Sequence, residues 1–207
     1  MSKKTLLITG TSGFIGFNFL KYILTKNYYI IDILREKNKK NFKLKKLRKN
    51  YPKNYKSIFF SNNHQLERKI KKLKINYFIN FATLYKNNHV YNDIFNFIKS
   101  NILFPTLIYD LISQKATKVI NFGSMMQHKS SEKFESKNLY SATKNAFEMI
   151  SNFYSYKEKN TKFYNLKLYE SFGKNDNRKK LIPTIISNYK KKKTTIITSK
   201  NLELNII

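Results

Sequence analysis

The stretch Thr5–Gly16, TLLITGTSGFIG, decides the fold of this 207-residue chain. Leu6, Leu7 and Ile8 form a short apolar run, which predicts a strand buried on both faces. A glycine-rich turn and then a helical pattern follow this run. Strand, glycine-rich turn and helix in this order can hold a dinucleotide pyrophosphate. The turn brings backbone N–H groups close to the phosphates, and the helix N-terminus carries partial positive charge.

The glycine spacing departs from the Rossmann fingerprint G-x-G-x-x-G, because Gly10, Gly13 and Gly16 stand three residues apart twice. The first glycine permits the tight turn, the second lets the phosphates approach, and the third lets the helix pack against the strand. A plain turn is the alternative, and the position directly after a buried strand weakens it. The spacing resembles that of short-chain dehydrogenases/reductases, which predicts a second motif downstream.

Length and composition narrow the class of protein. The chain can bury one substantial core and is expected to form one domain with the start of another. It contains no cysteine, which excludes disulfides and thiolate metal sites. Its three histidines are isolated, so no metal site is predicted. The apolar run near the N-terminus is too short for a signal peptide, and no segment approaches the ~18 apolar residues of a membrane span. We expect a soluble, cytoplasmic protein with no membrane partner.

The net charge of +29 would ordinarily indicate a nucleic-acid or anionic-membrane partner. Nearly all of this charge is lysine, dispersed over predicted helix faces with no arginine cluster. Lys, Asn, Ile, Phe and Tyr are abundant, and all use A/T-rich codons. Genomic base composition therefore explains the charge better than a polyanion does, and a basic nucleic-acid-binding module stays a remote alternative.

Strands and helices alternate along the chain. Strands are expected at 6–8, 28–34, 57–60, 77–81, 118–122 and 162–168, and helices at 14–25, within 37–56, and at 64–73, 92–112 and 138–158, with a kink or break at Pro105. This alternation predicts an α/β fold, a Rossmann-like doubly wound parallel sheet with helices on both faces. Ligands of such sheets lie beyond the carboxyl ends of the strands.

The second motif is YSATK, residues 140–144, with Ser124 at a predicted strand end upstream. Tyr140 and Lys144 are four residues apart and share one face of a helix. The lysine ammonium favours the phenolate and lowers the pKa of the tyrosine, which can then exchange a proton with a substrate hydroxyl or carbonyl. Ser124 can hydrogen-bond the same oxygen. On its own this spacing is mostly a surface coincidence, but its place after the fifth strand favours catalysis.

With these motifs the chain resembles the extended short-chain dehydrogenases/reductases, the NAD(P)-dependent epimerases, dehydratases and reductases of sugar nucleotides. The quoted segments are TGTSGFIG (9–16), INFAT (79–83), VINFGS (119–124), YSATK and LKLYESFGKND (166–176). The resemblance implies a catalytic triad of Ser124, Tyr140 and Lys144. It also implies cofactor contacts at Gly10, Ser12, Gly13, Phe14, Ile15, Gly16, Ala82, Asn101, Tyr140, Lys144 and Tyr169.

The choice of cofactor depends on the end of the second strand, where NAD-binding relatives place an acid for the ribose hydroxyls. In this chain that place holds Leu34, followed by Arg35, and Asp32 lies farther back on the same face. Because an arginine without the acid suits a 2′-phosphate, NADP is favoured over NAD, with Arg35 as a cofactor residue.

Departures from the resemblance narrow the reaction. Sugar-nucleotide 4,6-dehydratases carry an Asp-Glu pair after the serine, where this chain has Met125 and Met126. The reaction that the resemblance still implies is hydride transfer at a sugar hydroxyl or ketone, at C4. The chain is then similar to an epimerase or to a reductase of the CDP-abequose synthase type, which makes deoxysugars for surface polysaccharide. A non-catalytic or decayed NAD(P)-binding member is the alternative.

The resemblance also predicts the domain organisation. Residues 1–170 are expected to form the NAD(P)-binding domain with the triad, and 171–207 the start of a substrate-binding lobe that is largely missing, which implies a truncated product. Residues 194–207 resemble a further strand. The expected substrate is a nucleotide sugar. The expected assembly is a homodimer through the helices at 92–112 and 138–158.

Overall fold

The computed structural model describes residues 3–128, 135–174, 176, 178 and 180–197. By its contacts the chain divides into two units, Met1–Lys167 and Leu168–Ile207. The first unit contains the glycine turn, Ser124 and YSATK, whereas most of the segment 166–176 and all of 194–207 belong to the second unit, which is described by itself below.

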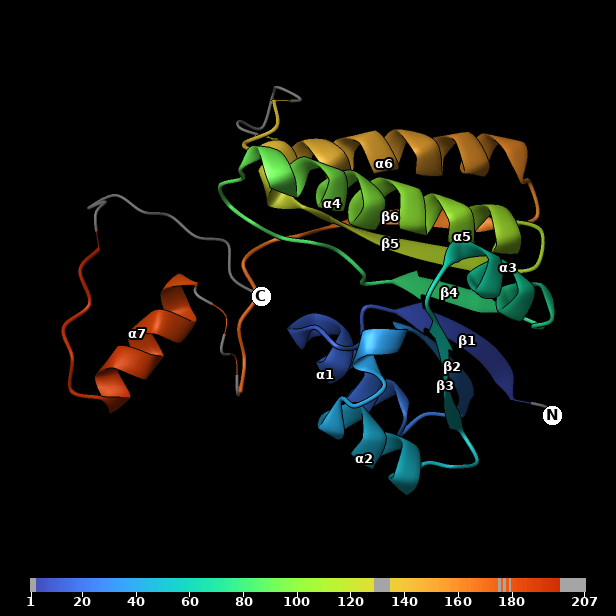
Figure 1. The fold of residues 1–207 in the computed structure, drawn as a ribbon, viewed down its shortest axis with the longest axis horizontal. Coiled ribbons are helices and arrows are strands. Elements are labelled where there is room, and N and C mark those ends of the chain that lie inside the picture. Colours follow the sequence, from blue (N-terminus) through green and yellow to red (C-terminus); the bar gives the residue numbers. More distant parts are fainter. Residues whose placement is uncertain (1–2, 129–134, 175, 177, 179, 198–207) are drawn as a thin grey trace. The chain divides into compact units, whose positions relative to one another are not determined.

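A single six-stranded sheet forms the centre of the first unit (Figure 1). Its strands are β1 (Lys4–Thr9), β2 (Tyr28–Arg35), β3 (Tyr55–Phe60), β4 (Tyr77–Asn80), β5 (Lys118–Ser124) and β6 (Lys162–Leu168). The strand order is β3-β2-β1-β4-β5-β6, and the four pairings from β3 across to β5 are parallel. The order reverses between β1 and β4, which is the switch point of a doubly wound sheet. The predicted Rossmann-like α/β fold is confirmed.

Helices cover both faces of the sheet (Figure 1). The helices are α1 (Phe14–Ile23), α2 (Phe42–Asn50), α3 (Asn63–Lys71), α4 (Ile94–Ile98), α5 (Phe104–Ile112) and α6 (Leu139–Lys157). One core cluster joins α1 and α2 to the sheet through Leu20 and Leu44. The other joins α3, α5 and α6 through Ile70, Ile108 and Phe147. Successive residues of β1 and β2 alternate between the two cores, as expected for strands buried on both faces.

The helix expected over 92–112 is interrupted. A 3₁₀ turn (Tyr91–Asp93) leads into α4, a π-helical turn (Lys99–Leu103) follows, and α5 begins one residue before Pro105. Proline lacks the N–H that a continuing α-helix requires, so a widened turn directly before it is the expected adjustment. The predicted break at Pro105 is therefore confirmed as a π-bulge.

The second unit contains one described helix, α7 (Leu181–Lys190), which ends where Lys192 takes a left-handed φ of 53°. Arg178 donates to the Asp176 carboxylate at 2.6 Å, and Lys180 pairs with Glu170 at 2.9 Å. A strand was expected over 194–207. Residues 194–197 are not in a strand, and the remainder of that segment lies outside the described residues.

Candidate functional site

The glycine turn is packed so closely that only glycine fits at two of its positions. Gly10 has a φ of 76°, and a Cβ there would collide with the backbone of Phe81 and Ala82 after β4. A Cβ at Gly16 would collide with the carbonyl of Gly10. The turn is therefore wedged between the end of β4 and helix α1, at the switch point of the sheet.

Helix α1 presents an open N-terminus beside this turn. Its N-cap is Gly13, which supplies no side-chain capping bond, and its first turn carries no acidic residue. Ser12 and Gly13 are exposed. A helix start with these properties favours an anion, because the first backbone N–H groups and the helix dipole both attract negative charge. The turn thus fits a pyrophosphate group, and Phe14 and Ile15 form the beginning of the same helix.

Helix α6 brings Tyr140 and Lys144 together on one buried face. The helix starts at an Asn138 N-cap whose side chain accepts from Ser141 N–H, and Tyr140 follows in the first turn. Tyr140 is 7% exposed and Lys144 is 5% exposed. The Lys144 ammonium donates to the Phe122 carbonyl of β5 at 2.7 Å, which ties the helix to the strand that ends at Ser124.

The environment shifts the proton affinities of both side chains. Burial raises the pKa of Tyr140, while side-chain hydrogen bonds with Ser124 and Thr83 act in the opposite direction. Burial lowers the pKa of Lys144 to about 8. The expectation that Lys144 lowers the pKa of the phenol is thus not met, since desolvation is the largest effect on Tyr140. The triad residues nevertheless lie together, with Ser124 hydrogen-bonded to the phenol.

Gln127 fixes Ser124 relative to helix α6. Ser124 is the N-cap of a 3₁₀ turn (Met125–Gln127), and its hydroxyl accepts from Met126 N–H at 3.3 Å. The completely buried Gln127 accepts from Ser124 N–H at 2.8 Å through its side-chain oxygen. Its side-chain nitrogen lies 2.6 Å from Asn145 Oδ1 and 2.6 Å from Glu148 Oε2, both on α6. The serine and the tyrosine therefore belong to one connected framework.

Asn101 connects the segment after β4 to helix α6 through its side-chain amide. Its amide oxygen accepts from Leu84 N–H at 2.7 Å and from the Thr83 hydroxyl at 3.1 Å. Its amide nitrogen donates to the Leu84 carbonyl at 3.0 Å and to the Thr143 hydroxyl at 2.9 Å. Four hydrogen bonds satisfy the whole amide. Asn101 therefore joins the segment after β4 to α6, and direct cofactor contact by Asn101 stays a prediction.

At the end of β2, Leu34 is 2% exposed, and Asp32 is completely buried. Arg35 is the last residue of the strand, and its guanidinium donates to the Ser100 hydroxyl at 2.9 Å. The acidic side chain of this strand is thus inside the protein, and the basic one lies at the strand end.

Most of the predicted site residues gather at the carboxyl edge of the sheet in the first unit. The glycine turn and Ala82 adjoin one another, and Ser124, Tyr140 and Lys144 form a second group. Tyr169 is the second residue of the other unit and is 43% exposed, so its cofactor contact stays a prediction.

Sequence reasoning missed three residues of the site. Thr83 hydrogen-bonds Tyr140, and its place at a predicted strand end was the available signal. The ring of Tyr85 packs edge-on against Tyr140, with centroids 4.9 Å apart. The role of Gln127 is set by tertiary contacts, and no local pattern marks it.

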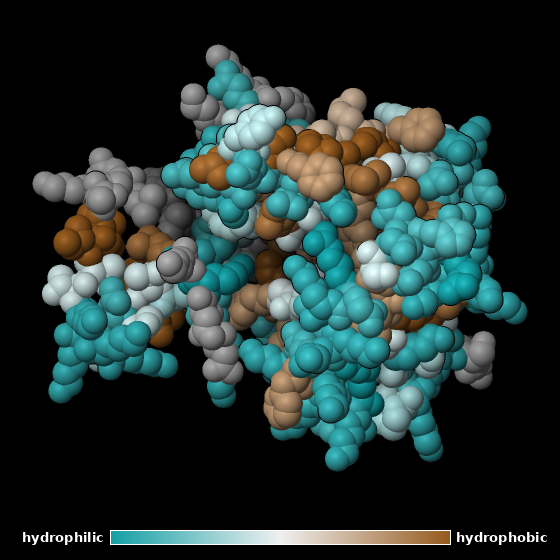
Figure 2. Space-filling view, in the orientation of Figure 1, coloured by the Kyte–Doolittle hydropathy of each residue, from teal (hydrophilic) through white to brown (hydrophobic). Residues whose placement is uncertain are grey.

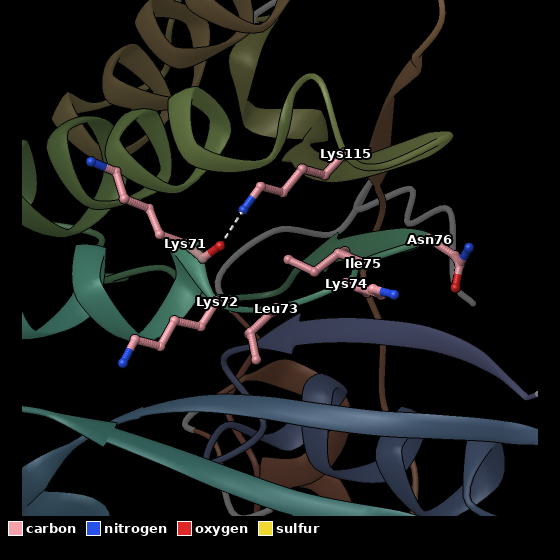
Figure 3. A pocket seen from close by; sticks show the side chains of 7 residues that line it. All are labelled: Lys71, Lys72, Leu73, Lys74, Ile75, Asn76 and Lys115. Carbon is pink, nitrogen blue, oxygen red and sulfur yellow. Dashed lines mark hydrogen bonds between the residues drawn. The ribbon is translucent and has the colours of Figure 1, made fainter.

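A hollow of about 470 Å³ lies near the opposite edge of the sheet, before the first residues of β4 and β5. Its lysines do not converge (Figure 3). The Lys115 ammonium donates to the Lys71 carbonyl at 2.8 Å, the Lys71 ammonium pairs with Glu67, and Lys72 points away. This hollow is therefore not built to bind an anion.

In the space-filling view, hydrophilic residues are spread over the visible face of the first unit (Figure 2). None of the described helices is both long enough and apolar enough to cross a membrane.

No curated protein matches the chain in sequence. Pen from Bacillus thuringiensis has a TM-score of 0.79 and 19% identity, over 100% of this chain and 62% of that one. The dTDP-glucose 4,6-dehydratase of Bacillus anthracis, solved with NAD, has a TM-score of 0.73 and 22% identity, over 91% and 62%. The UDP-Glc/GlcNAc 4-epimerase of Campylobacter jejuni has a TM-score of 0.74 and 15% identity, over 92% and 63%.

At these identities the likeness concerns the fold, and the chain spans less than two thirds of each of these three structures. A family model also matches almost the whole chain in sequence. The family described as the NAD dependent epimerase/dehydratase family matches residues 6–203. The chain therefore belongs to the NAD-dependent epimerase/dehydratase family.

Proposed function

We propose that this chain is the cofactor-binding and catalytic part of an NAD(P)-dependent enzyme that acts on a nucleotide sugar. The reaction class is hydride transfer at a sugar hydroxyl or ketone, at C4, as in an epimerase or a reductase of deoxysugar or surface-polysaccharide synthesis. The single observation that carries this proposal is the grouping of Ser124, Tyr140 and Lys144 at the sheet edge that also holds the glycine turn.

In this proposal the glycine turn and the start of α1 hold the cofactor pyrophosphate, and Ala82 lines the cofactor beside the turn. The bound cofactor supplies or accepts the hydride. The residues fit such a group, because the turn is shaped by backbone contacts that exclude any Cβ and the helix start attracts an anion. The proposal also places Asn101 and Tyr169 beside the cofactor.

Tyr140 is the proposed general acid and base. Its hydroxyl gives a proton to the sugar oxygen or takes one from it, while Ser124 hydrogen-bonds the same oxygen. Lys144 lies one turn from Tyr140 on the same buried face, and its proposed role is to oppose, when charged, the effect of burial on the phenol. The edge-on ring of Tyr85 limits access of water to the phenol on that side.

NADP is the proposed cofactor in preference to NAD. Asp32 is completely buried and accepts from Thr11 and Tyr55, so it does not reach out to ribose hydroxyls. Arg35 at the strand end is suited to a 2′-phosphate, because its planar guanidinium can make two parallel hydrogen bonds to a phosphate. The matching family is described as NAD dependent, so the affinities of the protein for NADP and for NAD have to be compared directly.

A 4,6-dehydratase is disfavoured, since Met125 and Met126 cannot transfer protons where an Asp-Glu pair is needed. A non-catalytic NAD(P)-binding role is the second candidate, and the same two methionines favour it. The two candidates differ in whether bound cofactor is turned over.

The test measures binding of NADP and NAD by calorimetry, and conversion of nucleotide sugars by chromatography, for the wild type and Tyr140→Phe. We expect tighter NADP binding, turnover in the wild type, and a 10²- to 10⁴-fold loss in Tyr140→Phe, on the order of a general acid's contribution. Tyr109→Phe is the matched control, because Tyr109 is a buried phenol that packs against Phe147 in the core. Equal turnover in Tyr140→Phe and the control would remove Tyr140 from the mechanism.

We also propose that the assembly is a homodimer formed through α4 and α6. Apolar side chains are exposed on both helices, with Phe95 69%, Met149 70% and Phe153 57% exposed. Figure 2 shows apolar residues gathered on the surface over these helices. Light scattering checks this proposal: Phe153→Glu is expected to convert a dimer into a monomer, and a monomeric wild type would refute it.

A further inference from the structure

Asp32 in the middle of β2 is a buried carboxyl group that the proposed chemistry does not use. It is completely buried on the sheet face that also holds Ile30 and Leu34, beneath α1 and α2. Its Oδ2 accepts from the Thr11 hydroxyl at 2.5 Å and from the Tyr55 hydroxyl at 2.9 Å. A carboxyl group at such a position is costly to bury unless it is hydrogen-bonded. The hydrogen-bond partners of Asp32 therefore indicate its structural role.

Thr11 belongs to the glycine turn itself. Its side chain is completely buried, whereas the next two residues, Ser12 and Gly13, are exposed. The side chain of Thr11 therefore points inward to β2, whereas Ser12 and Gly13 face away from the protein. Because Gly10 has a left-handed φ and glycine-rich segments are conformationally permissive, the turn needs such an anchor to keep one shape.

Asp32 is in turn held by β3 and α2. Tyr55 of β3 is 3% exposed, and its hydroxyl accepts from the Ser57 hydroxyl at 3.4 Å. Arg48 of α2 donates to Ser57 at 3.0 Å, and its charge favours the ionised carboxyl. The other carboxyl oxygen, Oδ1, has no hydrogen-bond partner within the described part of the chain. Tyr55 therefore bonds the same carboxyl oxygen that holds Thr11, and Arg48 supports this arrangement through Ser57.

We propose that Asp32 is a positioning residue for dinucleotide binding, and that it acts through Thr11 to keep the glycine turn in its phosphate-binding shape. Asp32 itself touches no phosphate. The proposal rests on the proposed function only in naming a dinucleotide as the ligand. It explains why an acidic residue lies in a strand whose neighbouring positions are apolar, two residues before the place where a ribose-binding acid would stand.

The experiment compares Thr11→Val, which keeps the shape and removes the hydroxyl, with Thr11→Ser and Asp32→Asn, which keep a donor and an acceptor. Hydrogen exchange is measured on peptides covering the turn, 10–16, and on α3 as an internal reference. Affinity for NADP is measured by calorimetry. We expect Thr11→Val to raise exchange in the turn alone and to weaken NADP binding about tenfold, which is the effect of losing one hydrogen bond. Thr11→Ser is expected to stay close to the wild type, and Asp32→Asn is expected to keep the wild-type NADP affinity and the wild-type exchange of the turn relative to α3.

Two results would overturn the inference. One is unchanged turn exchange in Thr11→Val, and the other is an equal rise of exchange in the turn and in α3, which would indicate general destabilisation. Failure of the proposed function gives a separate result. If the wild type binds no dinucleotide, but exchange still rises in the turn alone in Thr11→Val, the anchoring role of Asp32 is supported and the proposed ligand is refuted.

Discussion

The buried carboxyl of Asp32 makes the stability of this protein depend on pH. Burial raises the pKa of Asp32 from 3.8 to about 7, against the opposing hydrogen bonds from Thr11 and Tyr55 and the charge of Arg48. Below pH 3.8 the folded and the unfolded chain both hold the proton, and the contribution of the neutral carboxyl is complete. As pH rises towards 7, the unfolded chain alone gives up its proton, so this contribution falls, and it is lost above that pH.

The size of this effect follows from the two pKa values. A tenfold change in proton affinity is worth about 1.4 kcal/mol, so the interval from 3.8 to about 7 corresponds to about 4 kcal/mol of unfolding free energy. Urea unfolding of the wild type and of Asp32→Asn, measured between about pH 4 and pH 8, gives the difference directly. We expect the stability of the wild type to decline by this amount relative to Asp32→Asn as pH rises.

Asp93 provides a control of opposite sign. A hydrogen bond from Lys86 holds the pKa of this carboxyl below its ordinary value, so its contribution to stability is present above that value and falls as pH is lowered. Asp93→Asn lacks this contribution, so it is expected to be less stable than the wild type near neutral pH and to approach the wild type at the acidic end of the range. Parallel stability curves for the wild type and Asp32→Asn would refute the reasoning about burial.

Three further predictions concern the site. Gly10→Ala is expected to destabilise the fold by more than about 2 kcal/mol, because it combines a left-handed φ with a backbone collision. Gly13→Ala has more room and is the control, so equal decreases of the melting temperature in the two variants would contradict this prediction. Asn101→Ala removes four hydrogen bonds of a buried amide and leaves the buried Thr143 hydroxyl without this partner, so it is expected to cost about 2–4 kcal/mol in urea unfolding; a change below about 0.5 kcal/mol would contradict it. Arg35→Ala is expected to weaken NADP binding about tenfold or more with little effect on NAD, as calorimetry can check; equal losses for both cofactors would remove the 2′-phosphate from the explanation.

Much of the fold could be predicted because its determinants are local. The apolar run at Leu6–Ile8 and the glycine triplet mark the first strand, turn and helix, and the remaining strands are short β-branched or aromatic runs. Pro105 predicts a break in its helix because a proline has no N–H. The π-helical form of that break could not be predicted from the proline; Asn101 lies within this turn and makes four hydrogen bonds to segments distant in the sequence.

The candidate site was predicted where side-chain spacing and helix geometry suffice, as for Tyr140 and Lys144. The pKa of Tyr140 could not be read from that spacing, because desolvation by the surrounding fold is its largest contribution. Thr11 and Asp32 are 21 residues apart in the sequence, and only the pairing of β1 with β2 brings them together. Contacts of this kind depend on the register of the whole sheet.

The proposed chemistry is tested most directly by following nicotinamide absorbance after rapid mixing with nucleotide sugars. The protein is loaded with oxidised or reduced NADP and mixed with a panel of nucleoside diphosphate sugars, in the wild type and in Tyr140→Phe. We predict an absorbance change from hydride transfer with at least one sugar in the wild type, slowed on the order of 10²-fold or more in Tyr140→Phe. Bound cofactor that stays unchanged with every sugar, or a change of equal rate in Tyr140→Phe, would contradict the assignment of this site to hydride transfer.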